Sequence, residues 1–326
     1  MVCQVRDHPL VQKVTRLYEK ISSLDDLRPS KDVDALFTQL VLTCIPPSPI
    51  DVTALPCPWL HLMRSHLIKL CGQAESLLES HFSTLLGDSY QLPIHNLQVF
   101  PYYSNYINLA RLEFSLLKDH LPRDGPLPRK VAFVGSGPLP LSSIVLARDH
   151  LTSSIFYNYD IDPSAASMAK KLVSSDPDLS QRVLFRTSDI FNLTEELGEY
   201  DVVFLAALVG LDKEEKVRVV RHLVKYMKDE AMLMARSAHG ARAFLYPVLE
   251  PSELQGFKVL SVHHPSDEVI NSVVVARKCP PLQSMFLPKV GKKGEQVVGC
   301  NKCSKQFCDF DSGNNRGTAI DSGLIL

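Results

Sequence analysis

The sequence predicts an α/β protein in which an all-helical N-terminal domain precedes a doubly wound, mostly parallel sheet. Two observations predict this class. Apolar residues recur at spacings of three and four up to residue 120, and short apolar strands alternate with helices beyond that point. With 326 residues, the chain is long enough for about two domains. We expect a helical domain over residues 1–126, a sheet domain over 127–278 and a disordered tail over 279–326.

The composition is that of an ordinary globular chain. It is 45% hydrophobic and 22% charged, and its 35 basic residues nearly balance its 36 acidic ones. This balance argues against binding nucleic acid or a membrane surface through bulk charge. Apolar runs are shorter than the roughly 20 residues of a spanning helix, and the N-terminus lacks a signal-peptide pattern. We therefore expect a cytosolic protein with reduced cysteines.

Four helices are expected in the N-terminal domain, with proline-rich breaks between them. Proline removes a backbone donor and fixes φ, so the runs at 45–49 and 55–58 interrupt the helical pattern. A later break, LPRDGPLPR at 121–129, has the composition of a connection between domains. The expected helices are Leu10–Leu24, Asp32–Cys44, Leu60–Leu86 and Asn105–His120.

Seven strands are expected after this connection. Helices at Leu139–Leu151 and Pro163–Ser174 follow the first two strands, which gives a βαβ order. The last two strands are joined too closely for a crossover helix, so the seventh is expected to run antiparallel beside the sixth. This order is typical of the Rossmann-like fold that binds S-adenosylmethionine (SAM). The expected strands are 130–135, 154–162, 182–189, 200–208, 231–238, 257–265 and 271–278.

The segment 279–326 has neither helical nor strand periodicity. It is polar and glycine-rich, which predicts disorder. Cys300, Cys303 and Cys308 are spaced like part of a zinc ribbon, but no fourth ligand nearby completes a tetrahedral site. We therefore interpret these cysteines as incidental and predict no metal site.

A nucleoside site is expected where the first strand ends. Gly135, Ser136, Gly137 and Pro138 follow this strand, at a place where a doubly wound sheet lets a ligand approach its backbone closely. The third glycine of the dinucleotide fingerprint is absent, so a ligand without phosphates, such as SAM, fits better than NAD. The alternative is an ordinary turn.

Acidic residues follow the second and third strands. Either Asp160 or Asp162 could bind the ribose hydroxyls, but Asp162 directly precedes Pro163 and is the better helix cap, which leaves Asp160 as the better ribose ligand. Two further loops supply an acceptor for the adenine amine with an apolar neighbour, and small residues for the pocket floor. Their alternatives are capping and sheet core. These candidates are Asp189, Ile190, Ala206 and Ala207.

The helical domain carries the candidates for chemistry. Glu75 lies at the margin of a predicted buried stripe, where apolar neighbours would raise the pKa of its carboxyl group and favour a proton acceptor, whereas Glu79 points further out. The alternative for both is a charge in solvent. Tyrosines ahead of an arginine suit a sulfonium and a carboxylate, although such tyrosines are also common in cores. This group is Tyr102, Tyr103, Tyr106 and Arg111.

The chain resembles plant nicotianamine synthases in the stretches LCGQAESLLESHFSTLLG, NLQVFPYYSNYINLARLE, KVAFVGSGPLPLSSIVLA, NYDIDPSAASMAKKLV and ARSAHGARAFLYPVLEP, and overall up to about residue 278. The resemblance implies an enzyme that condenses three SAM molecules into nicotianamine and releases three molecules of 5′-methylthioadenosine, without a permanently bound cofactor. It implies Glu75 as the leading base, Glu79 as its rival, and the tyrosines and Arg111 as residues of a buried reaction chamber. Nicotianamine itself has carboxylates and amines suited to chelating iron, zinc, copper or nickel.

Two other functions stay open. The closest alternative is a SAM-dependent methyltransferase, and a different class is a nucleoside-binding module without turnover. The resemblance also points to trafficking-type signals at 106–109 and 116–117, but in an amphipathic helix these residues are more typical of buried core. We expect SAM as the partner and residence in the cytosol, with vesicle association and a homo-oligomer as open alternatives.

Overall fold

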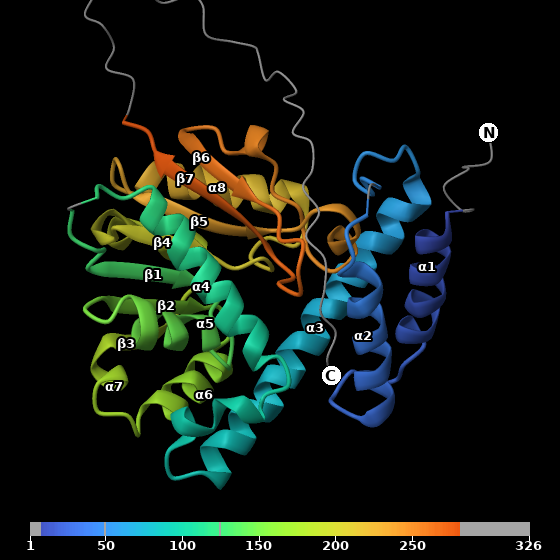
Figure 1. Cartoon of the computed structure of the whole chain (residues 1–326), viewed down its shortest axis with the longest axis horizontal. Coiled ribbons are helices and arrows are strands. Elements are labelled where there is room, and N and C mark those ends of the chain that lie inside the picture. Colours follow the sequence, from blue (N-terminus) through green and yellow to red (C-terminus); the bar gives the residue numbers. More distant parts are fainter. Residues whose placement is uncertain (1–7, 49, 124, 281–326) are drawn as a thin grey trace, which may run out of the picture. The chain divides into compact units, whose positions relative to one another are not determined.

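The computed structural model describes residues 8–48, 50–123 and 125–280, which belong to one compact unit (Figure 1). Its N-terminal part consists of α1 (Pro9–Ser22), α2 (Lys31–Cys44), α3 (Pro58–Ser89), the 3₁₀ segment η2 (Pro93–Val99) and α4 (Tyr103–Asp119). The four expected helices are therefore confirmed. Local signals explain where they begin, because proline opens α1 and α3 and the Ser30 side chain accepts a hydrogen bond from the Val33 backbone at the start of α2.

The sheet has seven strands in the order β3-β2-β1-β4-β5-β7-β6. Its first five strands are parallel, and β7 runs antiparallel to both neighbours, β5 and β6. The predicted antiparallel arrangement of the last two strands is thus confirmed. The bounds are β1 (Lys130–Val134), β2 (Ile155–Asp160), β3 (Val183–Thr187), β4 (Val202–Leu205), β5 (Met232–Ser237), β6 (Phe257–His263) and β7 (Ser272–Lys278).

Further helices connect these strands. The expected helix after β1 is α5 (Leu141–Val145), which continues as a π-helical segment, η3 (Leu146–His150), and the expected helix after β2 is α6 (Pro163–Val173). The sequence analysis did not name α8 (Lys213–Tyr226), which the Asp212 side chain caps. The remaining short segments are α7 (Leu179–Arg182), η4 (Ile190–Asn192), η5 (Glu195–Glu199), η6 (Gly240–Phe244) and η7 (Pro251–Glu253).

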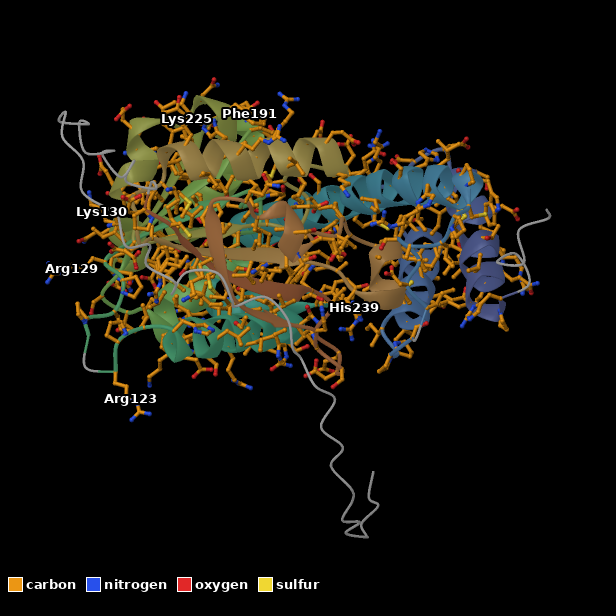
Figure 2. The ribbon with its side chains drawn as sticks, turned by 90° about the horizontal axis from the view of Figure 1, so that it is seen from above. Arg123, Arg129, Lys130, Phe191, Lys225 and His239 are labelled. Carbon is orange, nitrogen blue, oxygen red and sulfur yellow. The ribbon has the colours of Figure 1, made fainter. Side chains whose placement is uncertain are left out.

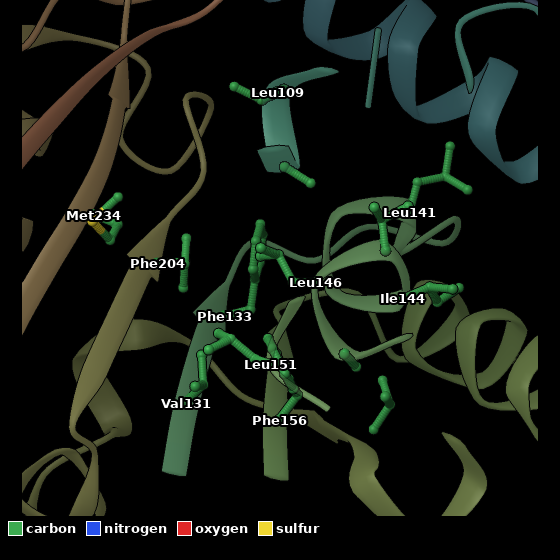
Figure 3. Packing of buried hydrophobic residues seen from close by; sticks show 14 of the residues in the cluster. Leu109, Val131, Phe133, Leu141, Ile144, Leu146, Leu151, Phe156, Phe204 and Met234 are labelled. Carbon is green, nitrogen blue, oxygen red and sulfur yellow. The ribbon is translucent and has the colours of Figure 1, made fainter. Parts of the chain in front are cut away.

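Helices cover both faces of the sheet. On one face, α4, α5 and α6 pack over a core that includes Phe133, Phe156 and Phe204 (Figure 3). On the other face, α8 packs over alternate residues of the same strands, such as Val203. Seen from above, α8 and α4 lie on opposite sides of the sheet (Figure 2). With both faces covered, a ligand is expected at the carboxyl ends of the parallel strands, where doubly wound sheets bind their ligands.

The long helix α3 takes part in two separate hydrophobic clusters. Leu67, in its first half, packs with α1 and α2, whereas Leu86, in its second half, packs with the core of the sheet. The predicted buried stripe runs from Met63 to Leu85 at helical spacing, and it is wrong at its end, because Leu85 is 37% exposed while Glu79, outside the stripe, is only 8% exposed. The buried face of α3 changes along the helix because its packing partners change. Glu75 and Glu79 lie where the helix passes from one cluster to the other.

Some predictions fall outside the described residues. The disorder expected for the tail and the interpretation of Cys300, Cys303 and Cys308 concern residues that the structure does not describe. Among the residues that it does describe, no helix has the length and apolar character needed to cross a membrane.

Candidate active site

A cavity of about 1280 Å³ opens at the carboxyl ends of β1, β2 and β4 and is lined by α3 and α4 as well. This is the edge at which doubly wound sheets bind ligands. Its volume exceeds the roughly 300–1,000 Å³ of an ordinary small-molecule pocket, so it has room for more than one nucleoside. The predicted residues that line it are Glu75, Glu79, Tyr102, Tyr106, Gly135, Ser136, Gly137, Pro138, Asp160, Asp162, Asp189, Ile190, Ala206 and Ala207.

The loop after β1 needs glycine at two positions. Gly135 has φ of 78° and Gly137 has φ of 68°, in the left-handed region that disfavours side chains. The backbone N–H of Gly137 donates to Oδ2 of Asp160 at 2.8 Å, which ties this loop to the end of β2. A Cβ on Gly137 would lie 2.5 Å from Oε2 of Glu79. The carboxylate of Glu79 therefore lies directly against the loop after β1, the predicted nucleoside loop (residues 135–138).

The aspartates at the strand ends are held by backbone amides. Asp162 caps α6 by accepting from the Ser164 backbone at 2.8 Å, as the sequence analysis expected, and Asp189 accepts from the Phe191 backbone at 2.9 Å. Oδ1 of Asp160 accepts from the Asp162 backbone at 3.0 Å. An ionised carboxylate has about four lone-pair positions. Each aspartate can therefore position its loop and still accept from a ligand.

Two glutamates and two tyrosines form a hydrogen-bonded group, here called the Glu–Tyr cluster: Glu75, Glu79, Tyr106 and Tyr246. The hydroxyl of Tyr106 donates to Oε1 of Glu79 at 2.9 Å and lies 3.5 Å from Oε1 of Glu75. The hydroxyl of Tyr246 donates to Oε2 of Glu75 at 3.0 Å. The sequence analysis did not single out Tyr246, although it lies within a stretch that carried the family resemblance.

Burial and mutual contacts shift the pKa values of the residues in the Glu–Tyr cluster. Burial raises the pKa of Glu79 well above 4.5, and the neighbouring charge of Glu75 raises it further. Burial also raises the pKa of Glu75, but the Tyr246 hydrogen bond and the charge of Arg236 oppose this rise. Burial and the carboxylates raise the pKa of Tyr106, so its hydroxyl stays a donor at neutral pH. Glu75 is therefore ionised before Glu79 as the pH rises.

The structure corrects the predicted orientation of Glu79. The sequence analysis placed Glu79 further from the buried stripe than Glu75, yet Glu79 is the buried residue and Glu75 is half-buried. The reason is the change of packing partners along α3, which a single helical stripe does not anticipate. Both carboxylates consequently face the cavity.

A buried arginine supplies positive charge to the same cavity, and the sequence analysis missed it. Arg236 in β5 is 7% exposed and forms a two-fold ion pair, from Nε and Nη2, with the carboxylate of Glu113 at 2.7 and 3.0 Å. Nη2 also donates to Oγ of Ser142 at 2.6 Å. The guanidinium lies 5.2 Å from the ring centre of Phe133. An arginine inside the apolar strand AMLMARSA was the available signal.

Two predicted chamber residues lie elsewhere. Arg111 is exposed on α4 and donates to Oδ1 of Asn108 at 3.4 Å, and the hydroxyl of Tyr103 accepts from Arg148 at 3.1 Å. Neither lines the cavity. Five residues beyond Tyr106, Arg111 lies about 140° around the helix and so faces away from the cavity. This corrects its predicted placement.

The segments 106–109 and 116–117, which resemble trafficking signals, lie on α4. Leu109 and Leu117 are 2% and 0% exposed, as expected for core residues, whereas Ile107, Asn108 and Leu116 are only partly buried. Among the described residues, no group of three or more histidine, cysteine, aspartate or glutamate side chains could hold a metal ion.

Comparisons with known proteins point to one family. Residues 3–283 match the family model described as nicotianamine synthase protein. A nicotianamine synthase of Solanum lycopersicum is 60% identical over 280 residues, 86% of each chain. Nicotianamine synthase 2 of Arabidopsis thaliana is 50% identical over 326 residues, which cover all of this chain and 98% of the relative.

Solved structures of a protein called MtNAS are also similar. A glutamate-to-glutamine mutant of MtNAS in complex with S-adenosylmethionine is 25% identical, with a TM-score of 0.67 over 82% of this chain and 98% of the other. MtNAS in complex with MTA and tNA is 24% identical, with a TM-score of 0.69 over 84% and 99%. The second likeness bears on the fold alone.

Proposed function

The chain belongs to the nicotianamine synthase family, and we propose that its cavity joins aminocarboxypropyl chains from three SAM molecules into nicotianamine, releasing three molecules of 5′-methylthioadenosine. The observation that carries this proposal is the meeting of the Glu–Tyr cluster with the nucleoside loops in one cavity. Methyl transfer to an amine would need the same proton acceptor, so the size of the cavity, which has room for more than one nucleoside, favours the joining of several SAM chains over methyl transfer.

Each transfer exchanges one bond for another. An α-amino nitrogen attacks the γ-carbon of a SAM aminocarboxypropyl chain, a C–N bond forms, and the C–S bond breaks with its electron pair passing to sulfur. The leaving thioether is neutral and requires no acid. The ammonium must lose a proton before it attacks, so a carboxylate of suitable basicity accelerates the step. Two intermolecular transfers lengthen the chain, and one intramolecular attack closes the azetidine ring.

Glu79 fits the role of this proton acceptor. Its Oε2 lies against the nucleoside loop at Gly137, and its raised pKa brings its basicity closer to that of an amine. Tyr106 holds its other oxygen at 2.9 Å. Glu75, which the sequence analysis ranked first, is the rival, and its hydrogen bond from Tyr246 favours an electrostatic role beside the ammonium.

The nucleoside part of SAM is assigned to the loops at the sheet edge. We propose that Asp160 accepts from the ribose hydroxyls, that Asp189 receives the adenine amine, and that Ile190 packs against the ring. Ala206 and Ala207 would form the floor beneath it. Positioning of the two reacting chains in line would supply much of the remaining acceleration.

Identification of the sulfur-containing product tests the proposed function. Incubation of the purified protein with SAM should release 5′-methylthioadenosine. Release of S-adenosylhomocysteine instead would mean methyl transfer and would overturn the proposal. SAM binding with no product of either kind would leave a nucleoside-binding module.

The cellular location and the oligomeric state are proposals as well. We propose that the protein acts in the cytosol on SAM as a small-molecule substrate, with vesicle association and self-association as the alternatives to test by fractionation and light scattering. We also propose that residues 1–126 and 127–278 are the helical domain and the sheet domain, packed together in one compact unit, and that side chains of both line the cavity.

A further inference from the structure

We propose that Arg236 and Asn271 form a carboxylate subsite that holds the amino acid head of a SAM molecule while its amine faces the Glu–Tyr cluster. This inference rests on the proposed function and names the residues that orient its substrate. None of the candidates predicted from the sequence fills this role, because Arg111 lies outside the cavity.

Arg236 has hydrogen-bonding capacity left for a ligand. A guanidinium has five N–H donors, and the three bonds to Glu113 and Ser142 use Nε and Nη2. Nη1 donates to no residue within the described ranges. The ion pair with Glu113 and the ring of Phe133 hold the guanidinium plane in place. Arg236 therefore offers an oriented donor at low entropic cost.

Asn271 supplies a second donor near Arg236. Arg236 of β5 lies opposite Val273 of β7, and Asn271 directly precedes the first residue of β7, so the two residues lie near each other at one end of this strand pair. Asn271 is 8% exposed and lines the cavity. Its Nδ2 is buried with no hydrogen-bond partner among the described residues. A buried unpaired donor is unfavourable, and a turn of the amide toward a ligand would supply the missing hydrogen-bond partner.

The charges of the cavity lining match an amino acid head. Three cationic residues line the cavity in the described chain, and of these Lys69 and Arg218 are exposed while Arg236 is buried. Arg236 lies close enough to Glu75 for their opposite charges to interact. The amino and carboxylate groups of an amino acid share one carbon atom. A carboxylate at Arg236 and Asn271 therefore directs the amine toward the Glu–Tyr cluster.

Two unreactive ligands together measure how much the carboxylate contributes to binding. S-adenosylhomocysteine carries the same aminocarboxypropyl chain as SAM but has a poor leaving group, and its decarboxylated analogue lacks only the carboxylate. Calorimetric titration of the full-length protein should give a dissociation constant at least about tenfold lower for S-adenosylhomocysteine, the usual effect of a charged hydrogen bond. Asn271→Leu and Arg236→Lys should each reduce this preference to about twofold, with affinity for the decarboxylated probe nearly unchanged.

The control variant is Asn192→Leu, an identical change at an exposed residue that does not line the cavity. It should keep the full preference. The proposal is overturned if either cavity variant weakens both probes equally, or if the preference stays unchanged. Because neither probe reacts, this result is independent of product identity, so failure of the subsite and failure of the proposed function are distinguishable.

Discussion

Glu75 and Glu79 lie one turn apart on α3, yet their surroundings affect the pKa values of the two carboxyl groups differently. Tyr246 and Arg236 stabilise the ionised form of Glu75, whereas Glu79 is more buried and lies beside the charge of Glu75. Glu79 therefore keeps its proton to higher pH and is the stronger base. Both glutamates were predicted from the sequence, with Glu75 ranked first, but the contact that separates their surroundings could not be predicted, because Tyr246 is 171 residues from Glu75 along the chain.

Glu79→Gln should separate binding from chemistry. The substitution preserves shape but removes the proton acceptor, so turnover should fall by roughly 100-fold or more. The affinity for SAM should change little, because the group acts mainly in the transition state. Release of 5′-methylthioadenosine and SAM binding are measured together. The matched variant is Glu75→Gln, and normal turnover in Glu79→Gln with loss in Glu75→Gln would move the role to Glu75.

The pH dependence of turnover should also reflect the proposed role of Glu79 as the proton acceptor. The ionised form of Glu79 accepts the proton, so turnover should rise with pH up to its raised pKa and then level off. Removal of the Glu75 charge lowers the pKa of Glu79, so Glu75→Gln should shift this rise to lower pH. Rate profiles of the unsubstituted protein and of Glu75→Gln provide the measurement. A shift to higher pH in Glu75→Gln would contradict the assignment.

At the scale of elements, α8 positions the floor of the nucleoside site through a buried lysine. Lys216 is 0% exposed, and its Nζ donates to the carbonyl oxygens of Ala207 and Val209 at 2.7 and 2.6 Å. Burial lowers its pKa to about 7. Lys216 shares the buried face of α8 with Val219 and Leu223. Helical periodicity does not report these hydrogen bonds to the loop after β4.

Lys216→Met should loosen the loop after β4. The methionine fills similar space but cannot bond either carbonyl, so KM for SAM should rise about tenfold while kcat changes less than twofold. Steady-state kinetics provide the measurement. Lys213→Met, on the exposed side of the same helix, is the matched control and should leave both constants unchanged. Equal losses of kcat in both variants would argue against a positioning role for Lys216.

At the scale of the whole molecule, periodicity predicted the helices and strands but not how they meet. The strand order could be predicted from connection lengths only as far as the antiparallel last pair, and not the insertion of β7 between β5 and β6. The site depends on contacts across the fold, such as Arg236 of β5 with Glu113 of α4. These contacts decide which arginine faces the cavity, and no local pattern reports them.

Removal of residues 284–326 should leave folding and turnover largely intact. The family match ends at residue 283, and all the residues named above for the cavity precede it. Thermal unfolding and SAM turnover of the shortened chain provide the test. A shortened chain that is insoluble, or that has lost most of its turnover, would show that the last segment contributes to the folded enzyme.

The ratio of products tests the account most directly. With SAM as the sole substrate, the purified protein should release three molecules of 5′-methylthioadenosine for each molecule of nicotianamine, because two transfers and one ring closure each break one C–S bond. Chromatographic quantification of both products gives this ratio. Release of S-adenosylhomocysteine, or a ratio of one, would contradict the claim that this cavity performs three successive aminocarboxypropyl transfers.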